Sequence, residues 1–203
     1  MIHMKNEVIR HYDLLIDEGN DPVLDSPDLQ EYMNQWDGQV FVELLKLDKT
    51  TSVLEIGCGT GRLAVRVAPN VKSFCGIDFS SKTVATAKKH LPFPNVTLIC
   101  DDFLEYDFKE TFDVIYASLT FLHIENKEKA ISIVSKLLNE NGRFILSIDK
   151  NTDNVFDYGT RCLKTFPDSP SHIKALLTKY RFQNIEMHET KRAYIFACVK
   201  PSN

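Results

Sequence analysis

The sequence has 203 residues, a length that suits one α/β domain with a small addition. Hydrophobic residues make up 43% and charged residues 26%, as is usual for globular proteins. The net charge of −4 gives no electrostatic reason to expect nucleic acid or an anionic membrane as a partner. The apolar runs are strand-sized, so we expect no membrane span. The five cysteines lie scattered without a C-x-x-C pair, which favours reduced cysteines of a cytoplasmic protein over a disulfide frame or a metal site.

The N-terminal part of the chain has helical patterns. Apolar residues at helical spacing predict a first helix over residues 3–18, and the Gly-Asn-Asp-Pro turn that follows ends it. Ser26 before a proline is typical of a helix start, and a second helical stretch follows, with Gly38 as the point where it splits. Because these helices precede the first strand pattern, we expect residues 1–48 to form a helical lid on a core of residues 49–203.

Strand and helix patterns alternate through the rest of the chain. Such alternation indicates an α/β fold with a doubly wound, mostly parallel sheet covered by helices on both faces. The last two strands have no helix between them, which adds one antiparallel strand. Polar residues at the carboxyl ends of parallel strands face one crevice. The predicted strands cover residues 53–56, 71–77, 96–100, 112–117, 144–148, 182–187 and 193–199.

The most informative motif is E-x-G-x-G-x-G, formed by Glu55, Gly57, Gly59 and Gly61 between the first strand and a helix. Glycine can take φ > 0 and lets a ligand lie against the backbone. The helix N-terminus adds free N–H groups and a partial positive charge. A dinucleotide fingerprint has the different spacing G-x-G-x-x-G and holds a pyrophosphate. The carboxylate of Glu55 repels a phosphate but suits a ligand that carries an amine.

This motif resembles motif I of the class I S-adenosylmethionine-dependent methyltransferases, whose ligand has an amino-acid end and no phosphate. The alternative is a glycine-rich turn in another α/β protein. The resemblance covers roughly residues 53–149. It implies a seven-stranded sheet of order 3-2-1-4-5-7-6 with the last strand antiparallel, and S-adenosyl-L-methionine as the cofactor.

Acidic residues at the strand ends extend the resemblance. Asp78 follows Gly57 by about 20 residues, the distance at which an acidic residue meets ribose hydroxyls. The family pattern implies that Asp101, rather than its neighbour, holds the adenine amino group, while the backbone after it serves the ring edge. Phe79 either packs on the adenine or belongs to the core. The predicted cofactor-binding residues are Glu55, Gly57, Gly59, Gly61, Asp78, Phe79, Asp101, Asp102, Phe103 and Ser118.

His123 follows the fourth predicted strand, near the expected methyl end of the cofactor. Methyl transfer from a sulfonium is an in-line displacement that depends on alignment and needs no metal. An oxygen or nitrogen nucleophile also benefits from a base, and histidine titrates near neutrality. We therefore predict His123 as the catalytic residue. The alternative is that it packs at a helix start or shapes the pocket.

The acceptor must approach from outside the core motifs, under the lid and the long loop of residues 149–167. Aromatic faces hold a flat or cationic acceptor, and an arginine pairs with a carboxylate. The alternative is that these aromatic side chains dock the helices to the sheet. The predicted substrate residues are Tyr12, Tyr32, Trp36, Asp149, Tyr158 and Arg161.

The resemblance implies a methyltransferase, and we expect a small-molecule acceptor with an oxygen, nitrogen or sulfur nucleophile. The net charge, the acidic lid and the strand-sized apolar runs indicate no nucleic acid or membrane partner. One alternative is a non-catalytic protein that binds the cofactor as a sensor or partner. A nucleotide-dependent oxidoreductase on a similar sheet is disfavoured by the glycine spacing and by Glu55. The sequence leaves the acceptor and the oligomeric state open.

Overall fold

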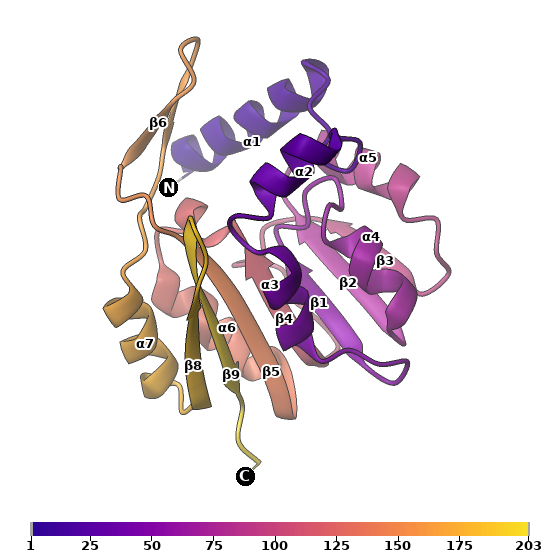
Figure 1. Cartoon of the computed structure of the whole chain (residues 1–203), viewed down its shortest axis with the longest axis vertical. Coiled ribbons are helices and arrows are strands. Elements are labelled where there is room, and N and C mark those ends of the chain that lie inside the picture. The colour runs from indigo at the N-terminus through magenta and orange to yellow at the C-terminus, as the bar shows by residue number, and fades with distance from the viewer. Residues whose placement is uncertain (1, 203) are drawn as a thin grey trace.

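The computed structural model describes residues 2–202, with side chains from residue 6 onward. Within that range seven strands form one sheet in the order β3-β2-β1-β4-β5-β9-β8 (Figure 1). Strands β1 to β5 are parallel, and β9 is antiparallel to both β5 and β8. The predicted order and the single antiparallel strand are confirmed. The bounds are β1 Ser52–Ile56, β2 Ser73–Asp78, β3 Val96–Cys100, β4 Phe112–Ser118, β5 Leu138–Asp149, β8 Gln183–Glu189 and β9 Ala193–Val199.

Helices cover both faces of the sheet, as predicted. Val53 packs with α3, α4 and α5, whereas Leu54 packs with α6 and α7 on the other face. Successive side chains of a strand point to opposite faces, so one strand serves both layers. Both side chains are fully buried, and such burial contributes about 1.5–3 kcal/mol each. The helices are α3 Gly38–Leu45, α4 Ala64–Val67 followed by the 3-10 turn η1 Ala68–Asn70, α5 Ser81–His90, α6 Lys127–Leu137 and α7 Pro170–Lys179.

Helices α1 (Ile2–Asp17) and α2 (Pro27–Met33) lie over the carboxyl ends of the strands (Figure 1). Polar contacts dock this region on α5: Ser80 Oγ donates to Asp13 at 2.7 Å, and His90 Nε2 lies 2.6 Å from a carboxylate oxygen of Asp21. Among the described helices, none is long and apolar enough to cross a membrane.

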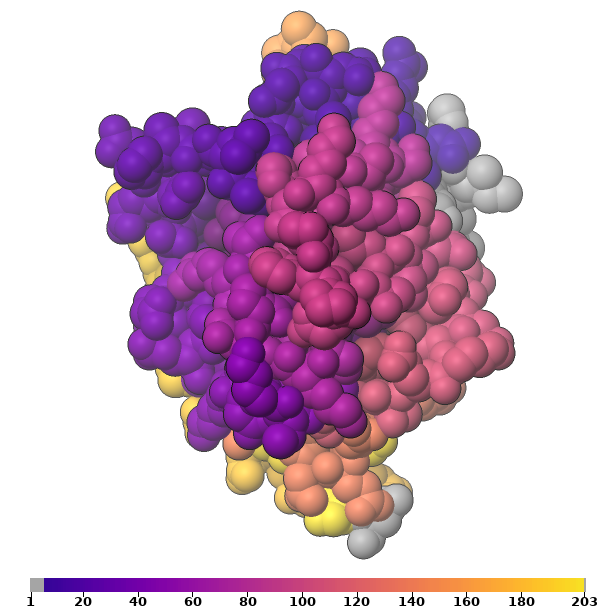
Figure 2. Space-filling view, turned by 90° about the vertical axis from the view of Figure 1, so that its right-hand side faces the viewer, coloured from indigo at the N-terminus to yellow at the C-terminus, as the bar shows by residue number. Residues whose placement is uncertain are grey.

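The expected long loop after β5 contains a short hairpin, formed by β6 (Val155–Asp157) and β7 (Cys162–Lys164). Figure 2 shows its tip, in light orange, at the same end of the molecule as the indigo N-terminal segment. Leu163 is buried, while the Tyr158 side chain at the turn is half exposed. Strands of three residues leave too short a pattern to be recognised from sequence.

Helix α3 belongs to the core rather than to a detached lid. Phe41 and Leu45 are both fully buried and share a cluster with Val53. The split at Gly38 is confirmed, because α3 begins at that residue with φ 63°. The division of the chain into a lid and a core at residues 48 and 49 stays a prediction. The last helix of the predicted lid, α3, packs with the sheet.

Candidate active site

The glycine loop connects β1 to α4, and its glycines serve different purposes. Gly57, Gly59 and Gly61 have φ of 70°, 54° and 100°, a region that favours glycine. A Cβ at Gly57 would lie 2.6 Å from Thr120 Cγ2, whereas one at Gly59 would meet nothing within 4 Å in the described part of the chain. A Cβ at Gly61 would lie 3.2 Å from Leu91 Cδ1. Gly59 therefore keeps space open, while Gly57 and Gly61 permit close packing.

Asp78 ends β2 beside this loop. Its carboxylate accepts hydrogen bonds from the backbone N–H of Gly59 at 3.1 Å and of Ser80 at 2.9 Å. Burial raises the pKa of Asp78, although these hydrogen bonds oppose the rise. The carboxyl group is thus fixed in place by the neighbouring backbone. Phe79 follows it and is partly buried.

The end of β3 adds three neighbouring residues. The Asp102 N–H donates to Asp101 Oδ1 at 2.7 Å, and the Leu104 N–H donates to Asp102 Oδ1 at 2.9 Å. Asp101 is exposed, whereas Phe103 is buried. The end of β3 therefore offers an accessible carboxylate two residues before a buried aromatic side chain.

Glu55 is buried within β1, with only 4% of its surface exposed. The Tyr116 hydroxyl donates to Glu55 Oε2 at 2.9 Å. Burial raises the pKa of Glu55 to about 8, although the Tyr116 hydrogen bond and the nearby Arg62 lower it. Burial therefore favours the protonated form of this carboxyl group in the free protein.

Ser118 ends β4, and its Oγ donates to Asp37 at 2.8 Å. Asp37 also binds the guanidinium of Arg62. Neither Asp37 nor Arg62 was predicted from the sequence. The sequence did hold a clue to Arg62. The helix dipole disfavours a cation just before a helix, so an arginine at this position predicts an acidic partner nearby.

His123 lies in the 3-10 turn η2 (Phe121–His123) after β4, and its Nε2 is 2.7 Å from the Tyr12 hydroxyl of α1. Burial, together with smaller effects of the nearby His11 and Lys127, lowers the pKa of His123 to about 3. Burial also raises the pKa of Tyr12. Both groups are therefore neutral at physiological pH, and a base of such low pKa accepts protons weakly.

Five of the six predicted substrate residues have partners outside the cavity described below. Trp36 Nε1 donates to Asp149 Oδ2 at 2.9 Å, which ties the lid to the end of β5. Tyr32 stacks on Trp36, with ring centroids 5.3 Å apart. Arg161 pairs with Glu18 of the segment after α1, and Tyr158 lies beside it on the hairpin. The alternative that these side chains dock the lid and hairpin is favoured by these contacts.

A cavity of about 1020 Å³ joins the predicted elements. It is lined by the glycine loop with Glu55, Arg62 and Ser118, and by the ends of β2 and β3. The same cavity is also lined by Tyr12 of α1, by His123 and by Leu163 of β7. Gly61 is not part of the lining. The predicted site residues that line the cavity are Glu55, Gly57, Gly59, Asp78, Phe79, Asp101, Asp102, Phe103, Ser118, His123 and Tyr12.

Known proteins with a similar sequence are methyltransferases. Residues 47–195 match the family model described as a methyltransferase domain. An uncharacterized methyltransferase of Bacillus cytotoxicus is 36% identical over 98 residues, which cover 47% of this chain and 46% of that protein. A malonyl-[acyl-carrier protein] O-methyltransferase of the same organism is 28% identical over 156 residues, covering 70% and 54%. The matched stretch thus spans about half the length of these relatives.

Solved structures share the fold. The complex of DhpI with S-adenosylhomocysteine aligns with a TM-score of 0.77 at 15% identity, covering 98% of this chain and 97% of that one. Further structural neighbours are complexes with S-adenosylmethionine or S-adenosylhomocysteine. The sheet order, the glycine loop and the family match agree with one another. The chain therefore belongs to the class I methyltransferases, enzymes that use S-adenosylmethionine.

Proposed function

We propose that the chain transfers the methyl group of S-adenosylmethionine to a small-molecule acceptor with an oxygen, nitrogen or sulfur nucleophile. The observation that carries this proposal is the continuity of the cavity. A single chamber connects the glycine loop to the Tyr12–His123 pair beneath α1. Its volume of about 1020 Å³ is at the upper end for small-ligand sites, which suits a cofactor and an acceptor together.

The residues at the glycine-loop end fit the cofactor. The Asp78 carboxylate, held by two backbone N–H groups, suits the ribose hydroxyls. The open space at Gly59 lets the ligand approach the backbone. Asp101 offers an acceptor for the adenine amino group, with Phe79 and Phe103 as apolar neighbours. The buried Glu55 offers a carboxyl group to the ammonium of the amino-acid end.

The opposite end of the cavity suits an acceptor. When bound, the cofactor supplies an electrophilic methyl group, and the protein aligns the nucleophile with it. Tyr12 and His123 form a neutral hydrogen-bonded pair at this end. We propose that His123 holds the Tyr12 hydroxyl toward the acceptor, because its low pKa suits a hydrogen-bond partner better than a base.

The cover of the cavity supports a small acceptor. Helix α1 contributes Val8 and Tyr12, and the hairpin contributes Leu163 and Lys164, so the acceptor end is roofed on two sides. A duplex or folded chain would have to displace this roof. Some relatives are named malonyl-[acyl-carrier protein] O-methyltransferases, so malonyl compounds, both free and carried on an acyl-carrier protein, belong in a screen of acceptors. The five free cysteines agree with the predicted cytoplasmic location, which stays a prediction.

The experiment is a transfer assay with S-adenosylmethionine labelled in its methyl group. The protein is incubated with the low-molecular-weight fraction, the protein fraction and the nucleic acid fraction of a cell extract. We expect the label in small molecules, with one S-adenosylhomocysteine formed per methyl transferred. Asp78→Ala, which should bind the cofactor more weakly, serves as the control and should transfer less label at a low cofactor concentration. Label in protein or nucleic acid alone would contradict a small-molecule acceptor.

A further inference from the structure

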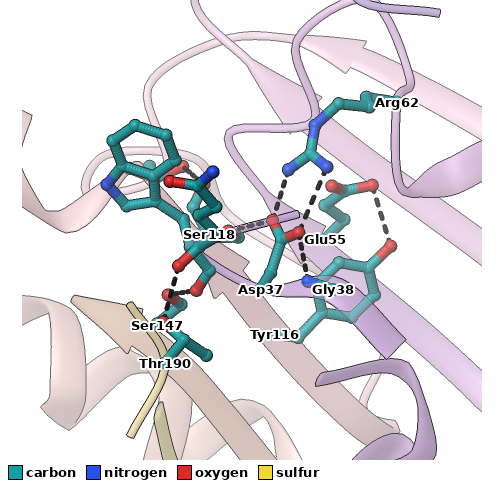
Figure 3. A network of polar contacts seen from close by, with 11 residues as sticks. Asp37, Gly38, Glu55, Arg62, Tyr116, Ser118, Ser147 and Thr190 are labelled. Carbon is teal, nitrogen blue, oxygen red and sulfur yellow. Dashed lines mark hydrogen bonds and ion pairs between the residues drawn. The ribbon is translucent and has the colours of Figure 1, made fainter. Parts of the chain in front are cut away.

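A buried polar network joins the N-terminal segment to the glycine-loop end of the cavity (Figure 3). Asp37 precedes α3 and is 1% exposed. Its carboxylate accepts hydrogen bonds from the Gly38 N–H at 2.6 Å, from Ser118 Oγ at 2.8 Å, and from both terminal nitrogens of Arg62, with Nη1 at 3.2 Å. Arg62 and Ser118 line the cavity, whereas Asp37 lies behind them.

The segment that carries Asp37 is itself fixed to the sheet. Ser147 Oγ of β5 donates to the Trp36 carbonyl at 2.7 Å. Thr190 Oγ1, in the turn between β8 and β9, donates to the Gln35 carbonyl at 2.7 Å. Figure 3 shows these contacts on one side of Asp37 and Arg62 on the other. The backbone just before Asp37 is therefore fixed by two separate parts of the fold, β5 and the turn between β8 and β9.

Asp37 uses two of the five guanidinium N–H donors of Arg62 and leaves the others available. Figure 3 shows the Arg62 guanidinium above the Asp37 carboxylate, with the Glu55 carboxyl group close beside it. Tyr116 occupies one oxygen of Glu55, which also lines the cavity. This end of the cavity therefore presents a guanidinium and a carboxyl group side by side, which complements a group that carries both a carboxylate and an ammonium.

We propose that Arg62 receives the carboxylate of the cofactor's amino-acid end, beside Glu55, and that Asp37 is the positioning residue that holds Arg62 in place. The inference rests on the proposed placement of the cofactor along the glycine loop. Under this proposal Asp37, a residue of the predicted lid of residues 1–48, becomes part of the cofactor site. Asp37 does not line the cavity, so it acts on the ligand through Arg62 and through Ser118, which it also holds.

Two ligands separate this role from a general structural one. S-adenosylhomocysteine carries the amino-acid end, whereas 5′-methylthioadenosine keeps the adenosine and the sulfur but lacks that end. Calorimetry with Asp37→Asn should show S-adenosylhomocysteine binding weakened about tenfold or more, as expected for disturbed charged hydrogen bonds. The affinity for methylthioadenosine should stay unchanged. Asp113→Asn is the matched control, because Asp113 accepts hydrogen bonds from Ser52 at the opposite ends of the strands.

A second variant keeps the test open if Asp37→Asn fails to fold. Arg62→Lys retains the charge but loses the planar guanidinium group. It should therefore weaken the binding of S-adenosylhomocysteine and leave the binding of methylthioadenosine unchanged. In the double variant Asp37→Asn/Arg62→Lys the loss should be smaller than the product of the single losses, because one residue acts through the other. Equal weakening of both ligands, or unchanged S-adenosylhomocysteine binding, would overturn the inference. A wild-type protein that binds neither ligand would instead overturn the cofactor placement itself.

Discussion

Adding one methyl group at Gly57 should destabilise the fold, whereas the same change at Gly59 should act mainly on ligand binding. Both residues have positive φ, for which alanine costs about 1–2 kcal/mol. At Gly57 the new Cβ would also lie 2.6 Å from Thr120 Cγ2 and 2.9 Å from Thr120 Cβ. Such overpacking adds about 1–3 kcal/mol. We therefore expect Gly57→Ala to cost about 2–5 kcal/mol and Gly59→Ala about 1–2 kcal/mol.

Urea unfolding of both variants measures this difference, and titration with S-adenosylhomocysteine measures binding. Gly59→Ala should bind at least about tenfold more weakly, because its Cβ enters the open side of the loop. Thr120→Ala removes two of the three clashing atoms, so it should restore part of the stability of Gly57→Ala through a coupling of about 0.5 kcal/mol or more. Equal stability of the two glycine variants, or the absence of coupling to Thr120, would refute this reasoning.

Three further predictions concern single side chains. Burial raises the pKa of Glu55 from 4.5 to about 8, so the folded state binds a proton that the unfolded chain releases. The free energy of unfolding should therefore fall as the pH rises from 4.5 to about 8. Urea unfolding across this pH range should show a smaller fall for Glu55→Gln. Asp78→Ala should weaken S-adenosylhomocysteine binding by about tenfold to a hundredfold in calorimetry, since charged hydrogen bonds are lost; wild-type affinity would remove Asp78 from the site. Arg161→Ala should speed chymotryptic cleavage at Tyr158, because the hairpin loses its ion pair with Glu18, and should leave cofactor affinity unchanged. A cleavage rate equal to that of the wild type would show that this pair does not hold the hairpin.

The sheet was predictable because its signals are local. Apolar runs of four to seven residues alternate with helical patterns, and Gly57, Gly59 and Gly61 mark the first turn. The strand ends that carry Asp78 and Asp101 meet at one edge because parallel strands share a direction. The hairpin of residues 155–164 was missed because its strands are short and depend on partners in α1 rather than on their own pattern.

The acceptor side was less predictable because its contacts join distant residues. Trp36 is of a residue type that often binds ligands, but its indole N–H donates a hydrogen bond to Asp149, which lies 113 positions away in the sequence. Arg161 likewise pairs with Glu18 across 143 positions. Asp37 was overlooked for the same reason. Its partner Arg62 lies 25 positions later in the sequence, after β1, and no local pattern links the two residues.

The central claim is that one cavity holds the cofactor along the glycine loop and directs its sulfur toward the Tyr12–His123 pair. A crystal structure of the complex with S-adenosylhomocysteine tests this claim most directly. We expect the ribose at Asp78, the adenine beside Asp101, and the sulfur on the side of Tyr12. A ligand bound elsewhere, or one whose adenine lies beside His123 and whose sulfur lies beside Asp101, would contradict the account.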